Sequence, residues 1–221
     1  MLREIGVEAE PVLIRRGSAE VDLDIASPAL FNHMIVYLPG QDKYLDPTSK
    51  GTRYGVLPGD QGKNILLPES NKLAKTPVRD AENSRALISQ QVTLNQDGSA
   101  QIAYQEEYRG IYGYSYKRAY QKYTPRQRKR LIKKGISRGF SNAQAEGIQI
   151  EGVEELETEL KIKISDLKAQ QYAKPMGNML SFKPLRFSLG LNKYAAAESR
   201  NYPLYFGFKR QAVREVEIDL P

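Results

Sequence analysis

The residues best suited to chemistry are the only histidine of the chain, His33, and the aspartate Asp46. An aspartate that accepts one ring N–H of a histidine fixes the tautomer of the ring and stabilises its protonated form. Such a pair supplies two of the three members of a nucleophilic triad. The alternative is an ordinary strand residue at His33 and an ordinary aspartate before a proline turn. Spacing alone favours this alternative.

A hairpin is needed to bring the two side chains together. Residues 31–38 predict a strand and residues 43–46 a returning strand, joined by the turn-forming sequence 39–42. With an even-length turn, paired positions add up to 81, and Asp46 becomes the diagonal neighbour of His33. Diagonal neighbours lie roughly 7–8 Å apart at the backbone, within reach of a carboxylate and an imidazole. An odd-length turn would place the two on opposite faces.

The composition excludes several classes of site. The 221 residues include no cysteine and one histidine, so disulfides, thiolate zinc sites, multi-histidine metal sites and a cysteine nucleophile within the chain are all excluded. We therefore expect no metal or cofactor site, and the candidate catalytic residues are His33 and Asp46. No run of 18 or more apolar residues occurs, so no membrane span is predicted.

One segment makes the chain basic. Residues 109–138 hold eleven lysines and arginines and no acidic residue. The positive charge of this segment exceeds the net charge of the whole chain, which is +7. Tyrosines alternate with these cations, a pattern typical of surfaces that bind single-stranded nucleic acid. The alternative is a solvated amphipathic helix with its tyrosines on a sheet and the glutamates of 146–159 beside it. Charge runs are usually solvated faces, which favours this alternative and makes nucleic acid an unlikely partner.

The remaining pattern predicts an α+β chain of mostly antiparallel β-structure. Met1 to Ile5 predict the end of a helix with Gly6 as its cap, and residues 68–83 predict a linker. Thr124 and Pro125 predict the start of a helix over 125–134. The predicted strands, besides the hairpin above, are residues 7–14, 64–67, 86–94, 100–108, 148–153, 157–164, 180–189, 202–208 and 213–218.

Several phrases in the first 67 residues are similar to those of a known family. They are Leu2-Arg3-Glu4-Ile5-Gly6-Val7-Glu8-Ala9, Phe31-Asn32-His33, Tyr44-Leu45-Asp46-Pro47-Thr48, and the pairs Leu57-Pro58 and Gln61-Gly62. In this order they resemble the transglutaminase-like superfamily, in its bacterial subgroup with flanking domains of unknown function. The resemblance implies a partial transglutaminase-like (papain-like) sheet over 1–67. It further implies a sandwich-like β-rich domain over 84–221, with the basic helix near 114–138.

The resemblance also implies a function. In that family a Cys-His-Asp triad attacks amide or peptide bonds, and its histidine and aspartate match His33 and Asp46. The family's cysteine would lie upstream of Met1. We therefore expect this chain to be the C-terminal part of a thiol hydrolase or acyltransferase that is inactive alone. Its substrate would be a protein or peptide in the bacterial periplasm or cell envelope.

A second function belongs to another class. The β-rich domain would act as a non-catalytic interaction module, and its basic, tyrosine-rich helix would bind an anionic partner. This hypothesis depends only on residues 109–138 and requires no nucleophile.

Overall fold

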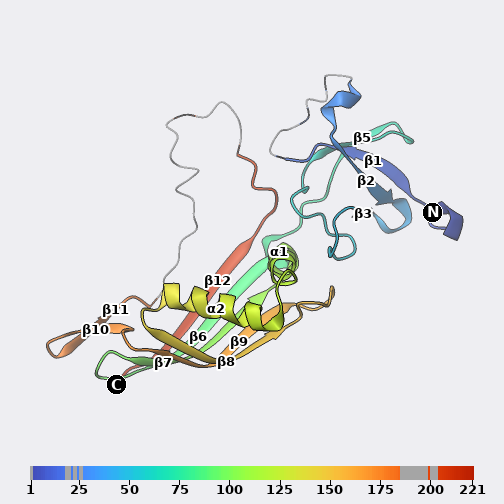
Figure 1. The fold of residues 1–221 in the computed structure, drawn as a ribbon. Helices are drawn as coiled ribbons and strands as arrows, with labels where there is room; N and C mark the ends of the chain where they lie inside the picture. Colours follow the sequence, from blue (N-terminus) through green and yellow to red (C-terminus); the bar gives the residue numbers. More distant parts are fainter. Residues whose placement is uncertain (1, 18–20, 22–23, 25–26, 185–198, 200–203) are drawn as a thin grey trace. The chain divides into compact units, whose positions relative to one another are not determined.

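A computed structural model describes residues 2–17, 21, 24, 27–184, 199 and 204–221 (Figure 1). The chain forms two compact units. The first comprises the described residues of 1–84 and 201–210, and the second those of 85–200 and 211–221. Antiparallel strands dominate both, and the two α-helices belong to the second unit, so the α+β class is confirmed.

The first unit is built on a five-stranded sheet in the order β3-β2-β1-β4-β5, in which every neighbouring pair is antiparallel. Buried residues alternate in two of its central strands, at Val12 and Ile14 and at Ile65 and Leu67, and form the core together with Ile35. The strands are β1 (Glu10–Ile14), β2 (His33–Leu38), β3 (Lys43–Leu45), β4 (Asn64–Leu67) and β5 (Lys72–Lys75). Short 3-10 turns punctuate this unit, namely η1 (Arg3–Ile5), η2 (Pro28–Leu30), η3 (Pro39–Gln41) and η4 (Ala81–Asn83).

The start of the chain agrees with the helix-end expectation. The element η1 ends at Gly6, whose φ of 75° lies in the left-handed region that favours glycine. The expected linker 68–83 instead contains β5, which pairs with β4 along its whole length. Three of the four β5 residues are exposed, so this edge strand has no apolar alternation that the sequence could reveal.

The second unit contains a five-stranded sheet in the order β12-β6-β7-β9-β8. Its neighbours are antiparallel except for β12, which lies parallel to β6 at the edge. The strands are β6 (Arg85–Leu94), β7 (Ala100–Tyr108), β8 (Ala143–Glu151), β9 (Leu160–Ala169) and β12 (Gln211–Asp219). A separate two-stranded sheet pairs β10 (Ala173–Met176) with β11 (Met179–Phe182).

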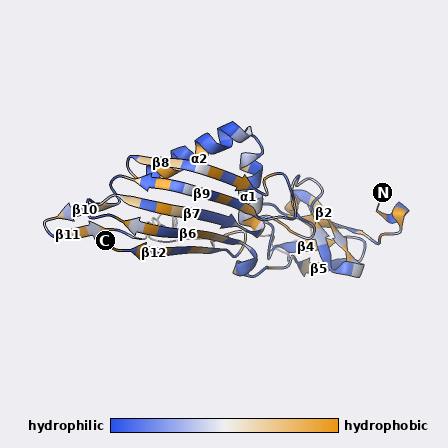
Figure 2. Ribbon diagram, turned by 90° about the horizontal axis from the view of Figure 1, so that it is seen from below, coloured by the Kyte–Doolittle hydropathy of each residue, from blue (hydrophilic) through white to orange (hydrophobic). Residues whose placement is uncertain are grey.

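The helices α1 (Gly110–Tyr120) and α2 (Pro125–Gly139) cover one face of this sheet (Figure 1). Figure 2 shows hydrophobic and hydrophilic residues alternating along its strands, as expected when one face is buried. Thr124 caps α2 in a reciprocal pair of hydrogen bonds with Gln127, which confirms the predicted start. The helix continues past the predicted end at Gly135, because Ile136 in its last turn packs into the core.

Two expectations from the sequence, a sandwich-like domain and a strand over 202–208, fail in the described residues. A sandwich-like domain does not form, because the five-stranded sheet packs against helices and its companion sheet is only a hairpin. Of the strand expected over 180–189, β11 accounts for the part up to Phe182, and residues from 185 lie outside the described residues. Residues 204–208 form no strand, and 202–203 also lie outside the described residues.

The turn between β6 and β7 depends on Gly98. Its φ is 83°, and a Cβ at this position would stand 2.4 Å from the carbonyl oxygen of Ala173. We expect Gly98→Ala to lower the free energy of unfolding by more than the roughly 1–2 kcal/mol that a left-handed alanine costs. Urea denaturation followed by circular dichroism measures this change.

Gly135→Ala is the matched control for that substitution. This helical glycine has nothing within 4 Å of the added Cβ, so alanine should raise the stability by about 1 kcal/mol. Equal effects of the two substitutions would contradict the role of Gly98.

Candidate active site

The register of the β2–β3 hairpin brings His33 and Asp46 together. Val36 pairs with Leu45 and Tyr37 with Tyr44, so paired positions add up to 81, as predicted. Asp46 follows the last residue of β3 and is therefore the diagonal neighbour of His33. Its Oδ2 lies 3.2 Å from His33 Nε2, which confirms the expected juxtaposition.

The carboxylate of Asp46 is held by several donors, and its side chain is completely buried. Thr48 donates to Oδ1 from its backbone nitrogen at 2.9 Å and from Oγ1 at 2.7 Å. Ser49 Oγ donates to Oδ2 at 2.9 Å, and the guanidinium of Arg16 pairs with the same oxygen. The residues that follow Asp46 thus fold back onto it, as aspartates commonly arrange at turns.

These partners keep Asp46 ionised. Burial is the largest single influence and raises the pKa of the carboxyl group. The hydrogen bonds from Thr48 and Ser49, with the charge of Arg16, together outweigh burial and hold the pKa below its ordinary value of 3.8. Asp46 is therefore an anion at neutral pH and is suited to accept a hydrogen bond from a protonated ring nitrogen of His33.

Arg16 is positioned by the pairing of β1 with β2. Ile14 pairs with His33, so the residues just after β1 lie beside the start of β2. Asn32 fixes this approach, because its Oδ1 accepts the backbone N–H of Arg16 at 2.7 Å and its Nδ2 donates to the backbone oxygen of Arg16 at 3.3 Å. The side chain of Arg16 can then reach the buried carboxylate.

Arg16 also bridges Asp46 to a second buried carboxylate. Its Nε donates to Asp60 Oδ2 at 3.1 Å, and Asp60 is only 3% exposed. One planar guanidinium thus serves two carboxylates, an arrangement that the fixed fork of arginine permits and the point charge of lysine does not. Asp46 and Asp60 thus share one cation, and Arg16 links the positions of the two carboxylates.

The loop that carries Asp60 is anchored by buried polar contacts. Thr76 Oγ1 donates to the backbone oxygen of Asp60 at 2.6 Å. Tyr205 Oη lies 2.8 Å from the backbone oxygen of Gln61. Burial, followed by the charge of Asp60, raises the pKa of Tyr205 to about 12. Lys63 Nζ lies 3.8 Å from the Tyr205 ring centroid and donates to the backbone oxygen of Gly17 at 2.6 Å. The loop therefore holds Asp60 in place.

The arrangement can move a proton. Because Nε2 of His33 faces Asp46, the other ring nitrogen, Nδ1, is left for a reacting group. The His33 side chain is 16% exposed, whereas that of Asp46 is not exposed at all. The partly exposed ring can therefore accept and return a proton while the buried carboxylate orients it. A nucleophile is still required, and the chain has no cysteine.

Sequence reasoning found His33 and Asp46 but missed Arg16, Asp60 and Ser49. Arg16 stands after a predicted strand in a run that looks like an ordinary polar loop. Its role follows only from the antiparallel pairing of Ile14 with His33, which the sequence pattern does not specify. A signal was present in the Asp46-Pro47-Thr48-Ser49 sequence, where two hydroxyl residues follow an aspartate.

Clusters of metal ligands and helices able to span a membrane are both absent from the described part of the chain. Within it, no group of three or more His, Cys, Asp or Glu side chains is placed to hold a metal ion. Neither described helix is long and apolar enough to cross a membrane.

The hydrogen bond from Thr48 Oγ1 predicts a pH-dependent stability. Folding lowers the pKa of Asp46, so ionised Asp46 stabilises the folded state. This contribution to the free energy of unfolding is complete above pH 3.8 and is lost as the pH falls through the lowered pKa. We expect Thr48→Val to reduce the free energy of unfolding by about 1–2 kcal/mol at neutral pH. The difference should shrink towards zero as Asp46 is protonated. Urea denaturation at a series of pH values measures it.

Thr52→Val in the same unit serves as the control, because the buried Oγ1 of Thr52 has no hydrogen-bond partner in the described structure. Its effect should be small and independent of pH. A Thr48→Val effect of equal size at neutral and strongly acidic pH would contradict the assignment of its hydroxyl to the Asp46 carboxylate.

Comparisons with known proteins find no match among protein-family models, curated proteins or solved structures. The resemblance to the transglutaminase-like superfamily therefore rests on the sequence phrases of residues 2–9, 31–33 and 44–48. What these phrases and the His33–Asp46 geometry mean for activity is a proposal.

Proposed function

We propose that this chain supplies the histidine and aspartate of a transglutaminase-like thiol hydrolase or acyltransferase. The observation that carries the proposal is the 3.2 Å approach of His33 Nε2 to a completely buried Asp46 carboxylate. A carboxylate held by Thr48, Ser49 and Arg16 cannot turn away from the imidazole. Rigid support of this kind is what an orienting residue needs.

The reaction would proceed in two halves. The thiol of a cysteine outside this sequence gives its proton to His33 Nδ1, and the thiolate attacks the carbonyl carbon of an amide. The C–N bond breaks, and the departing amine takes the proton from the imidazolium, which leaves a thioester. In the second half, His33 accepts a proton from water or from a second amine as it attacks the thioester. The thiol then leaves with that proton.

Asp46 would act throughout as an orienter. Its lowered pKa keeps it anionic while the imidazole gains and loses a proton, so the carboxylate stabilises the imidazolium without becoming protonated. Arg16 would be a positioning residue, because it acts on His33 only through Asp46. Water reacting in the second half gives hydrolysis, and an amine gives transfer.

If the proposal is right, the protein has residues before Met1, and the test uses the protein with those residues. That sequence should hold a Gly-x-Cys phrase within a few helical turns of Leu2. His33→Ala should abolish formation of the acyl-enzyme, detected by mass spectrometry with an activated amide or ester. Asp46→Asn should lower the rate by on the order of 10³–10⁴-fold, as loss of the orienting carboxylate does in comparable triads. Retained acylation in His33→Ala would refute the proposal.

Asp42→Asn in the same hairpin is the matched control, because Asp42 accepts a hydrogen bond from Tyr37 and does not contact His33. Its acylation rate should equal that of the parent. In the present chain, the single imidazole can be observed directly by long-range ¹H–¹⁵N spectroscopy. The neutral ring should carry its proton on Nε2, and Asp46→Asn should remove that preference.

A second candidate function is supported by the cations of the basic segment. Four of them are engaged: Arg109, Arg128 and Lys133 pair with glutamates of the 146–159 cluster, as expected, and the buried Lys117 donates to backbone oxygens. The other seven are exposed and face no acidic side chain within ion-pair distance among the described residues. They are Arg118, Lys122, Arg126, Lys129, Arg130, Lys134 and Arg138.

The tyrosines of this segment favour a polyanion over stacked bases. Tyr112 and Tyr120 pack against the core, and Tyr116 stacks on Tyr108 of the sheet at 4.1 Å between ring centroids. Few rings therefore remain to receive nucleobases. The interaction module would instead bind an anionic partner by charge alone, with a strong dependence on salt.

Replacing Lys122, Lys129 and Lys134 together by glutamine should lower the salt concentration at which the protein elutes from heparin. The number of counterions released on binding should fall by about one for each lysine that no longer pairs with the polyanion. The control replaces three exposed lysines away from the helices, Lys161, Lys163 and Lys174, and removes the same charge. Identical elution of the two triple variants would show that net charge, and not this surface, governs retention.

A further inference from the structure

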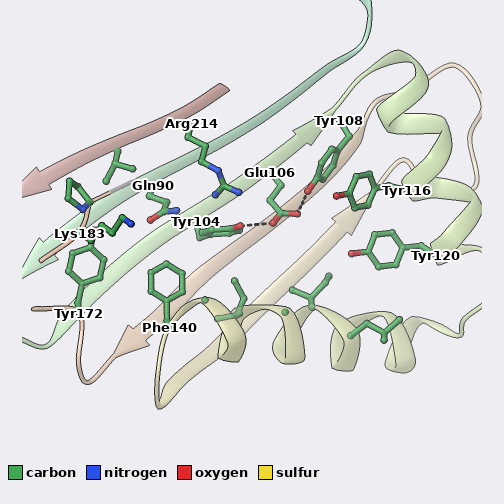
Figure 3. Close-up of a pocket in the computed structure, with 17 residues that line it drawn as sticks. Gln90, Tyr104, Glu106, Tyr108, Tyr116, Tyr120, Phe140, Tyr172, Lys183 and Arg214 are labelled. Carbon is green, nitrogen blue, oxygen red and sulfur yellow. Dashed lines mark hydrogen bonds between the residues drawn. The ribbon is translucent and has the colours of Figure 1, made fainter. Parts of the chain in front are cut away.

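A cavity of about 330 Å³ lies between the large sheet of the second unit and its helices (Figure 3). This volume is at the lower end of the range for small-molecule sites. Its walls combine rings, namely Tyr104, Tyr116, Tyr120, Phe140 and Tyr172, with charged and amide groups. None of its residues belongs to the unit that contains His33.

The cavity exists because part of the sheet face that the helices cover carries polar residues. β8 and β9 carry isoleucines that pack under α2, whereas Gln90 of β6, Glu106 of β7 and Arg214 of β12 occupy the same face further along. Strand register places them there: Arg214 pairs with Ile88, which pairs with Glu106, and directly opposed residues share a face. A purely structural core would place apolar residues at these positions.

Glu106 is fixed in place by two tyrosines of its own strand. Tyr104 Oη donates to Oε1 at 2.5 Å, and Tyr108 Oη donates to Oε2 at 2.8 Å. Burial, followed by the charge of Glu106, raises the pKa of both tyrosines, so both remain protonated donors. A carboxylate offers about four acceptor positions, and these two hydrogen bonds use two of them. Glu106 can therefore accept hydroxyl groups of a ligand.

Positive charge stands on the other side of Glu106. Figure 3 shows Arg214 between Gln90 and Glu106, with Lys183 beyond Gln90. The charge of Arg214 reaches into the cavity, since it opposes the effects of burial and Glu106 on the pKa of Tyr104. Two cations face one carboxylate, and the buried amide of Gln90 adds a further polar group.

Hydroxyl groups and ring faces complete the lining. Tyr116 and Tyr120 extend from α1 with their hydroxyls towards Glu106 (Figure 3). Burial, followed by the charge of Glu106, raises the pKa of Tyr120 to about 12, so it too is a neutral donor or acceptor. Flat aromatic faces pack well against a ring of similar size.

We propose that this cavity binds a small hydroxylated ring compound that carries a carboxylate. The carboxylate meets Arg214 and Lys183, as charge-assisted hydrogen bonds favour. The hydroxyls donate to Glu106, and the ring packs on the tyrosines and Phe140. Both an acidic sugar and a hydroxylated aromatic acid have this chemistry. The site is independent of the proposed catalytic pair.

The experiment titrates the protein with D-glucuronate, 4-hydroxybenzoate and D-glucose, followed by ¹H–¹⁵N correlation spectra. At least one of the two acids should bind with a Kd of about 1 mM or tighter, a value in keeping with its size. Glucose, which lacks the carboxylate, should bind at least tenfold more weakly. Which acid binds more tightly distinguishes a sugar ring from an aromatic one.

Variants locate the site. Arg214→Gln and Lys183→Gln should each weaken binding of the acid at least tenfold, whereas the control Lys163→Gln, on the opposite face of β9, should not change it. Lys183 is exposed, so its variant tests the proposal even if Arg214→Gln fails to fold. The proposal is overturned if neither acid binds at about 20 mM. It is also overturned if glucose binds as tightly, or if Lys183→Gln binds like the parent.

Discussion

The pairing of one guanidinium with two buried carboxylates is the interaction on which the first unit depends. Asp46 and Asp60 are both buried, and an isolated buried anion is costly enough to be neutralised or expelled. Arg16 pairs with both carboxylates, neutral donors from Thr48 and Ser49 also stabilise Asp46, and Asn32 holds Arg16 at the junction of β1 and β2. The site therefore cannot form until the strands pair in register.

The second unit manages a partly buried carboxylate in a different way. Glu106 accepts hydrogen bonds from the hydroxyls of Tyr104 and Tyr108, which are neutral donors. These two hydrogen bonds use two of the roughly four acceptor positions of the carboxylate, so Glu106 retains capacity for further donors. Asp46 has no such capacity to spare, because its oxygens already accept from four protein groups besides His33. Asp46 is therefore suited to orient the His33 ring, and Glu106 is suited to accept hydrogen bonds from a ligand.

The features that could be predicted from sequence are those that depend on near neighbours. The hairpin register, the Gly6 cap, the capping box at Thr124 and strand β4 all follow from residues a few positions apart. Strand β5, the parallel placement of β12 and the contacts of Arg16 depend on distant segments. The cavity positions of Gln90, Glu106 and Arg214 could not be predicted either, because polar residues of a strand usually lie on its solvent face.

The composition of the basic segment likewise does not show which of its residues face the sheet and which face solvent. Its tyrosines and cations are interleaved in sequence, yet folding separates them. In α1, Tyr112, Tyr116 and Tyr120 turn towards the sheet, while most cations of α2 turn outward. A helix has two faces, so a mixed sequence can line a cavity on one side and present charge on the other. The two surfaces can then recognise different partners, because residues that contribute to one are turned away from the other.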